Sequence, residues 1–182
     1  MLLQLLNTHY LKTMLMIYHS LIASHLLYGL RIWGNSGNKK IKKLEKIQKK
    51  AIRNIGTVKY NDHTERIYKS LKILKLTDQI TFNTSKLMHS IKYHYAPMAL
   101  TNLFSNESVN RRQDQNNLHE SFFPSDITLN KMPRQWNSLN SAYKAISPPK
   151  YFKTSLFSAF ISDYKEESNC TKNCYICNHI AQ

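Results

Sequence analysis

The sequence is poor in the residues that form tight turns, since its 182 residues include 4 glycines and 5 prolines. Hairpin-rich all-β folds need such residues at regular spacing, so their scarcity argues against that architecture. Hydrophobic residues make up 42% of the chain and aromatic residues 11%, which is enough to form a packed core. We therefore expect a mainly α protein, an irregular bundle of about five helices.

Cysteine is also scarce, and the three cysteines fall within eight residues of one another near the end of the sequence. Such a cluster cannot form a disulfide framework, which suggests a reducing compartment. Met1 is followed directly by apolar residues, without the positively charged segment and cleavage site of a secretory signal. We therefore expect an intracellular protein, nuclear or cytoplasmic, that is not secreted.

Long hydrophobic runs are missing. The longest uncharged run extends from Thr13 to Leu30 and contains two histidines and two serines. A membrane span needs about 20 predominantly apolar residues, so we expect no membrane span. Residues 1–33 instead have the pattern of a buried amphipathic helix ended by Gly34 and Gly37. Its predicted inner stripe consists of Leu11, Met14, Tyr18, Leu21, Ile22, His25 and Gly29.

Three polar or amphipathic side chains in this N-terminal segment, those of His25, Tyr28 and Trp33, lie on or beside the apolar stripe, and we expect their roles to be structural. His25 lies on the apolar stripe and Trp33 lies near the end of the segment. No cysteine or carboxylate lies at metal-site or triad spacing beside His25. We therefore expect His25 to form a hydrogen bond within the core, and Trp33 to pack against the next helix.

Acidic residues are few, with 11 Asp and Glu against 26 Lys and Arg and a formal net charge of +15. A small basic domain usually meets a polyanion, either nucleic acid or an anionic membrane surface. A biased genomic base composition, which enriches lysine, asparagine and isoleucine together, is the alternative explanation. The charge is concentrated, because residues 39–59 hold nine basic residues and one acidic residue. This distribution favours a binding face.

The segment 39–55 has the clearest helical pattern, with Gly56 as a candidate C-cap. Its apolar stripe consists of Ile41, Leu44, Ile47, Ala51 and Ile55. Its other side is basic and would lie on the phosphate backbone of RNA or DNA. The candidate nucleic-acid-binding residues are Lys39, Lys40, Lys42, Lys43, Lys46, Lys49, Lys50 and Arg53. A solvated helix face is the plainer interpretation of the same pattern.

The rest of the chain predicts further helices around one irregular part. One helix starts at Asn61 or Asp62, and another runs from Thr77 to Tyr95 before Pro97. An irregular polar segment near 105–135 leaves room for short strands. The last helix starts at Pro148–Pro149 and has Phe152, Leu156, Phe160 and Tyr164 on one face. The predicted organisation is a helical region over 1–100, a polar segment over 101–146, a C-terminal helix over 147–167 and a cysteine-rich tail over 168–182.

Six stretches occur in an order that resembles a known family. They are "YHSLIASHLLYGLRIWG" (18–34), "LEKIQKKAIRNI" (44–55), "HTERIYKSLKILKLTD" (63–78), "NNLH" (116–119), "QWNSLN" (135–140) and "FKTSLFSAF" (152–160). Together they resemble the region after the polymerase domain, on the thumb side, in reverse transcriptases of jockey-like non-LTR retrotransposons. The resemblance covers roughly residues 10–165. It implies a thumb-like helical region over 1–100 that holds nucleic acid for an RNA-directed DNA polymerase.

The chain also departs from that family. Arg66 stands where the family often has proline, and "NRRQDQ" (110–115) blurs a Thr-Arg element. Reverse transcription needs clustered carboxylates that hold two divalent ions, which the family places in a Tyr-x-Asp-Asp-like loop. None of the 11 acidic residues here forms an Asp-Asp pair. The resemblance therefore implies a non-catalytic C-terminal fragment, with Mg²⁺ only in the polymerase domain of a longer chain.

The cysteine-rich tail is a candidate zinc site made of Cys170, Cys174, Cys177 and His179. Three thiolates and an imidazole are a legitimate tetrahedral donor set. All four crowd into ten residues, however, whereas structural sites usually join two ligand pairs across a longer loop. A truncated cysteine-rich tail is the alternative. No Ser/His/Asp set, phosphate-binding glycine loop or paired acid–base carboxylates occur in the sequence.

Two further functions remain open at this stage. One is a domesticated helical protein-interaction module. The other is a peripheral membrane-surface protein that uses the apolar N-terminal segment together with the basic helix 39–55.

Overall fold

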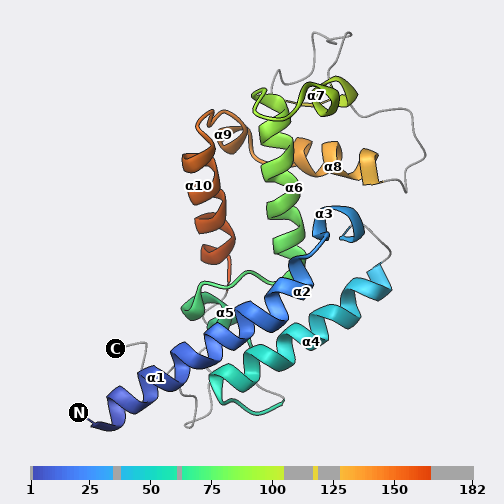
Figure 1. Ribbon diagram of the computed structural model, residues 1–182. Coiled ribbons are helices and arrows are strands. Elements are labelled where there is room, and N and C mark those ends of the chain that lie inside the picture. Colours follow the sequence, from blue (N-terminus) through green and yellow to red (C-terminus); the bar gives the residue numbers. More distant parts are fainter. Residues whose placement is uncertain (1, 35–37, 61–62, 105–116, 119–127, 165–182) are drawn as a thin grey trace. The chain divides into compact units, whose positions relative to one another are not determined.

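The structure is a computed structural model that describes residues 2–34, 38–60, 63–104, 117–118 and 128–164. These residues are mainly helical and contain no strand, so the predicted fold class is confirmed. The chain divides into two compact units (Figure 1). The first unit comprises Met1–Leu30, Gly37–Asp78 and Phe160–Gln182, and the second comprises Arg31–Ser36 and Gln79–Ala159.

The N-terminal segment is helical, but it contains a π-helical stretch that the sequence pattern did not predict. Helix α1 (Leu2–Ile17) continues as η1 (Tyr18–Ala23) and α2 (Ser24–Leu27). The wider turn makes Ala23, five residues after Tyr18, the next buried position. Leu21, predicted to face inward, is therefore 62% exposed.

A turn at Tyr28–Gly29 interrupts this segment before α3 (Leu30–Trp33). Tyr28 is extended with ψ 121°, and Gly29 has φ 62°, a left-handed conformation that favours glycine. The prediction of an unbroken helix with Gly29 on its inner stripe was wrong here. Tyr28, at the corner of this turn, is 84% exposed.

Helix α4 (Asn38–Gly56) confirms the predicted basic helix and runs beside α1 (Figure 1). The structure changes the predicted role of Gly56, because the left-handed residue that ends α4 is Thr57, with φ 51°. The amide of Val58 then donates to the carbonyl of Arg53 at 3.2 Å, as in a Schellman cap. Gly56 is instead a close-approach position, since a Cβ there would lie 2.8 Å from the Ile67 Cδ1 atom.

Helix α5 (Glu65–Leu71) follows, with Thr64 at its N-cap position. The predicted start at Asn61 or Asp62 was therefore too early, and both residues lie outside the described part of the chain. Ile67 and Tyr68 of α5 are fully buried in the first unit. Lys72 ends the helix in a left-handed conformation with φ 52°.

A single amide, that of Gln48, ties three segments of the first unit together. Its Nε2 group donates to the Tyr18 hydroxyl at 3.0 Å and to the Leu74 carbonyl at 3.0 Å. Its Oε1 atom accepts from the backbone amide of Leu76 at 2.9 Å. The Gln48 side chain is 4% exposed, so these bonds are made away from water. The Gln48 amide of α4 thereby satisfies the Tyr18 hydroxyl of η1, the Leu74 carbonyl after α5 and the amide of Leu76, the first residue of α6 (Leu76–Lys92).

Tyr164 holds the C-terminal part of the first unit against the same connection. Its hydroxyl donates to the Asp78 Oδ2 atom at 2.5 Å and accepts from the Lys75 amide at 2.9 Å. The Lys75 ammonium lies 4.6 Å from the centre of the Tyr164 ring and pairs with Glu65 at 2.5 Å. Tyr164 is buried, as its place on the predicted apolar face implied, but it lies beyond the end of the last helix at Ser162, and polar as well as apolar contacts hold it.

The second unit also consists of helices in its described part, and one of them overturns an expectation. Helix α8 (Thr128–Asn137) overlaps the segment near 105–135 that was predicted to be irregular, and Met132 and Trp136 form its buried apolar face despite Pro133. Helix α6 also stops earlier than predicted, at Lys92, and His94 is left-handed with φ 58°. The elements are α6 (Leu76–Lys92), α7 (Met98–Phe104), α8 (Thr128–Asn137), α9 (Ser141–Lys144) and α10 (Pro149–Ser162), of which α6 and α10 cross the boundary between the units.

His89 lies at the centre of the second core. Its ring stacks on Phe152 with centroids 4.2 Å apart and meets Trp136 edge-on at 6.3 Å. Its Nε2 atom lies 2.7 Å from the Ile146 carbonyl, which can only accept, so Nε2 carries the proton. Trp136 and Phe152 are fully buried. The core is thus aromatic, with one internally satisfied imidazole.

A polar clamp attaches residues 117–118 to this core. The Asn137 side chain accepts from the Leu118 amide at 2.9 Å and donates to the Leu118 carbonyl at 3.0 Å, as a neighbouring strand would. The buried Lys144 ammonium donates to the Asn117 Oδ1 atom at 2.8 Å. Through this clamp the "NNLH" and "QWNSLN" stretches, far apart in the sequence, meet in space.

Replacing Gln48 by Leu should destabilise the chain by about 3 kcal/mol, because three buried polar groups would lose their partner at about 1–3 kcal/mol each. Tyr18→Phe, which removes one of the three bonds, should cost about 1 kcal/mol. Urea unfolding followed by circular dichroism measures both values. Equal stabilities for Gln48→Leu and the parent chain would contradict the role given to this amide.

Burial lowers the pKa of His89, although its hydrogen bond to the Ile146 carbonyl acts in the opposite direction. The unfolded chain therefore takes up a proton near pH 6.5 while the folded chain does not, so stability should fall as the pH drops below about 6.5. His89→Gln should be less stable than the parent at pH 7.5 but show a shallower loss between pH 7 and pH 5. Parallel urea unfolding at several pH values measures this difference, and identical slopes would refute it.

Candidate nucleic-acid interface

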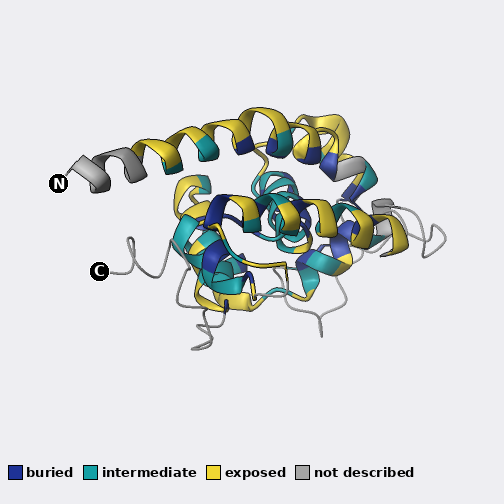
Figure 2. Ribbon diagram, turned by 90° about the horizontal axis from the view of Figure 1, so that it is seen from below, coloured by how far each residue is buried: buried dark blue, intermediate teal, exposed yellow. Residues whose placement is uncertain are grey.

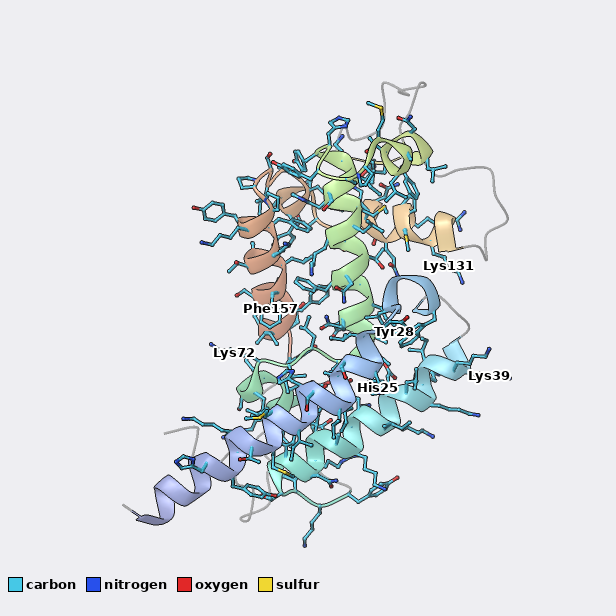
Figure 3. All side chains as sticks on the ribbon, viewed as in Figure 1. His25, Tyr28, Lys39, Lys72, Lys131 and Phe157 are labelled. Carbon is cyan, nitrogen blue, oxygen red and sulfur yellow. The ribbon has the colours of Figure 1, made fainter. Side chains whose placement is uncertain are left out.

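The predicted basic residues of α4 lie together on the side of the helix opposite its buried face. Ile41, Gln48 and Ile52 define the buried side. Six of the eight predicted residues are exposed, namely Lys39, Lys40, Lys42, Lys43, Lys46 and Lys50. Lys49 and Arg53 are half-buried at the edge of this surface. Figure 3 shows Lys39 extending from the N-terminal end of α4. We call these eight residues the basic face.

The basic face has a regular central row. Lys39, Lys43, Lys46 and Lys50 follow one another at steps of four, three and four residues, which places them on one line of the helix. From Lys39 to Arg53 the basic face extends about 21 Å at 1.5 Å per residue. In the part of the chain that the structure describes, no acidic side chain forms an ion pair with the four lysines of the row. Their positive field is therefore directed into solvent.

An aromatic residue at the end of this face was missed by the sequence analysis. Tyr60 follows the turn that ends α4 and is 79% exposed. The Arg53 guanidinium lies 5.3 Å from the centre of its ring, which is a cation–π distance. Interleaved basic and aromatic residues are a signal of nucleic-acid binding, but Tyr60 lies beyond the end of α4 at Gly56, so the helical period does not place its ring beside Arg53.

Two predicted features of the N-terminal segment changed in the structure. His25 is exposed, and its Nδ1 atom lies 2.7 Å from the carbonyl of Leu21 in its own helical segment. The prediction of a hydrogen bond within the core was therefore wrong, because the π turn rotates His25 to the surface. Trp33 is half-buried and belongs to the second unit, and its packing against the next helix stays a prediction.

The N-terminal segment also exposes several large apolar side chains, both before the π turn and after it begins. Figure 2 shows the exposed and buried sides of this segment as separate bands. Tyr10, Met16, Ile17, Leu21, Leu27 and Tyr28 are between 41% and 84% exposed. We call these six residues the apolar row. Single exposed apolar residues are ordinary, but a row along one segment marks a candidate interaction surface.

The predicted zinc ligands Cys170, Cys174, Cys177 and His179 lie outside the described residues. Among the residues that are described, no group of three or more His, Cys, Asp or Glu side chains could hold a metal ion. Burial raises the pKa of Tyr68 and of Tyr164 far above the usual range, so both remain neutral phenols. Neither is suited to act as a base.

Over the described ranges, no helix combines the length and the apolar character needed to cross a membrane.

Comparisons with protein-family models, with curated proteins and with solved structures found no match to this chain. Any functional conclusion must therefore come from the residues and their geometry.

Proposed function

We propose that this protein binds the backbone of RNA or DNA through the basic face of α4, without base-sequence readout and without catalysis. The observation that carries the proposal is the arrangement of eight cations on one side of a helix. The other side of α4 is fixed in the first unit by Gln48 and by buried isoleucines. A rigid row of lysines can follow a phosphate backbone, and phosphate contacts supply most of the non-specific affinity of such proteins.

Counterion release sets the expected strength and salt dependence of this binding. Each phosphate neutralised by a lysine contributes about −0.9 to the slope of log K against log salt on duplex DNA, and about −0.7 on a single strand. The four lysines of the central row would thus give slopes of about −3.6 and −2.8. Affinity should therefore weaken steeply with salt.

The family resemblance suggests the setting in which such binding would be used. We propose that the chain is a non-catalytic, thumb-side C-terminal portion of a non-LTR retrotransposon reverse transcriptase, whose parent activity is RNA-templated DNA synthesis. The order of the six sequence stretches supports this proposal. The catalytic carboxylates and Mg²⁺ would belong to the polymerase domain of a longer chain.

Reversing four charges on the basic face, Lys42→Glu, Lys46→Glu, Lys49→Glu and Lys50→Glu, should abolish binding to a labelled oligonucleotide at 100 mM salt. The reversed side chains would repel phosphates that the lysines attract. Fluorescence anisotropy over a salt series measures both the affinity and its slope, on RNA and on DNA.

The matched control reverses four exposed lysines elsewhere: Lys12, Lys72, Lys150 and Lys153. Both variants change the net charge by the same amount, so a loss confined to the first variant assigns binding to the basic face. Wild-type affinity in the first variant would refute the proposal. Salt-sensitive binding to anionic lipid vesicles, with no binding to oligonucleotides, would refute it in favour of a peripheral membrane protein.

A second candidate function is protein binding through the apolar row. The observation that favours it is the exposure of six large apolar side chains on one segment of the first unit. We propose the polymerase domain of the longer chain as the occupant, since that domain would precede this segment in the sequence. With that surface uncovered, the isolated chain should self-associate.

Met16→Gln combined with Leu21→Gln should reduce that self-association, because both side chains are more than 60% exposed and their apolar area would be replaced by amides. Sedimentation velocity at several protein concentrations measures the effect. As a control, oligonucleotide affinity should stay at the wild-type value. Unchanged self-association would contradict the assignment of this surface.

A further inference from the structure

Tyr60 is placed at the end of the basic face by the way in which α4 terminates. Thr57 takes a left-handed conformation, and the Val58 amide bonds back to the Arg53 carbonyl. The chain thus turns back along the last turn of α4. The Tyr60 ring then lies 5.3 Å from the Arg53 guanidinium while the residue remains 79% exposed.

Arg53 connects this ring to the lysines. It follows Lys49 by four residues and Lys46 by seven, so it continues the same side of the helix. Lys49 and Arg53 are about 6 Å apart along the helix axis. An exposed aromatic ring therefore stands at one end of a phosphate-binding row, with a cation against it.

We propose that Tyr60 is a stacking platform for an unpaired nucleobase, and that the ligand of the basic face is single-stranded nucleic acid. This inference rests on the proposed function. In a duplex the faces of the bases are occupied by their neighbours, whereas an unpaired base offers its π-face to a protein ring. The lysines hold the sugar–phosphate chain, and Tyr60 takes one base from it. The site accepts any base, because every base has such a face.

The alternative explanation is that the Tyr60 ring only packs against the Arg53 guanidinium. That contact is an exposed cation–π pair, which would influence stability and have no dependence on the bases of a ligand. A strand that lacks bases but keeps its phosphates separates the two explanations.

The experiment uses the full chain and fluorescence anisotropy with four probes of equal length: oligothymidine, oligouridine, an abasic deoxyribose-phosphate strand and a blunt DNA duplex. The wild-type chain should bind the two base-bearing single strands about tenfold more tightly than the abasic strand, within the range that one stacked base supplies. Tyr60→Ala should remove that tenfold difference and leave binding to the abasic strand and the duplex unchanged. Tyr60→Phe keeps the ring and should bind like wild type.

The charge-reversed variant of the four lysines separates failure of this inference from failure of the proposed function. Suppose that the charge-reversed variant loses all binding, but Tyr60→Ala keeps the wild-type ratio of affinities for base-bearing and abasic strands. The stacking platform is then refuted, and the proposal of backbone binding stands. If the charge-reversed variant binds all four probes like wild type, both proposals fall. A wild-type chain that prefers the duplex over oligothymidine would also overturn the inference.

Discussion

The arrangement of the first unit depends on one buried amide. Gln48 lies on the apolar side of α4, where an unpaired polar group would cost free energy, and it satisfies the Tyr18 hydroxyl and two backbone groups of the α5–α6 connection. Three bonds in different directions fix the rotation of α4 about its axis more sharply than apolar contacts alone, because hydrogen bonds are directional. The rotation in turn decides which residues face solvent, and so it orients the basic face.

The end of α4 places an exposed aromatic ring beside a charged helix face. Lysines along a helix attract any polyanion, and they give affinity without discrimination. The turn at Thr57 brings an aromatic ring back against Arg53, which adds a group that responds to bases and not to phosphates. The close approach of Gly56 to Ile67 fixes α5 directly behind this turn. Packing inside the first unit thus positions Tyr60, whose proposed role is to stack on a base of a bound strand.

Packing and hydrogen bonding in the second unit explain several residues that stand out in the sequence. Trp136 is buried against His89 and Phe152, and Asn137 pairs with both backbone groups of Leu118. The His89 imidazole donates a hydrogen bond to the Ile146 carbonyl and stacks on the Phe152 ring, so its role is structural and not catalytic. The motif-like stretches of this unit are therefore accounted for by packing and by hydrogen bonding. Function is better sought on the exposed residues of the first unit.

The sequence by itself determined the mainly helical class, the basic helix 39–55 and the burial of Phe152, Leu156 and Tyr164, because helical period and charge pattern are local properties of the chain. It did not determine the π turn at Tyr18–Ala23, which moved Leu21 and His25 to the surface, or the helix at Thr128–Asn137. It also did not reveal that Gln48 is the buried centre of the first unit or that Tyr60 meets Arg53. The bonds of Gln48 join residues that lie 26 to 30 positions apart in the chain, and Tyr60 meets Arg53 because the chain turns at Thr57. Helical period and charge pattern describe neither arrangement, so only the tertiary structure brings these residues together.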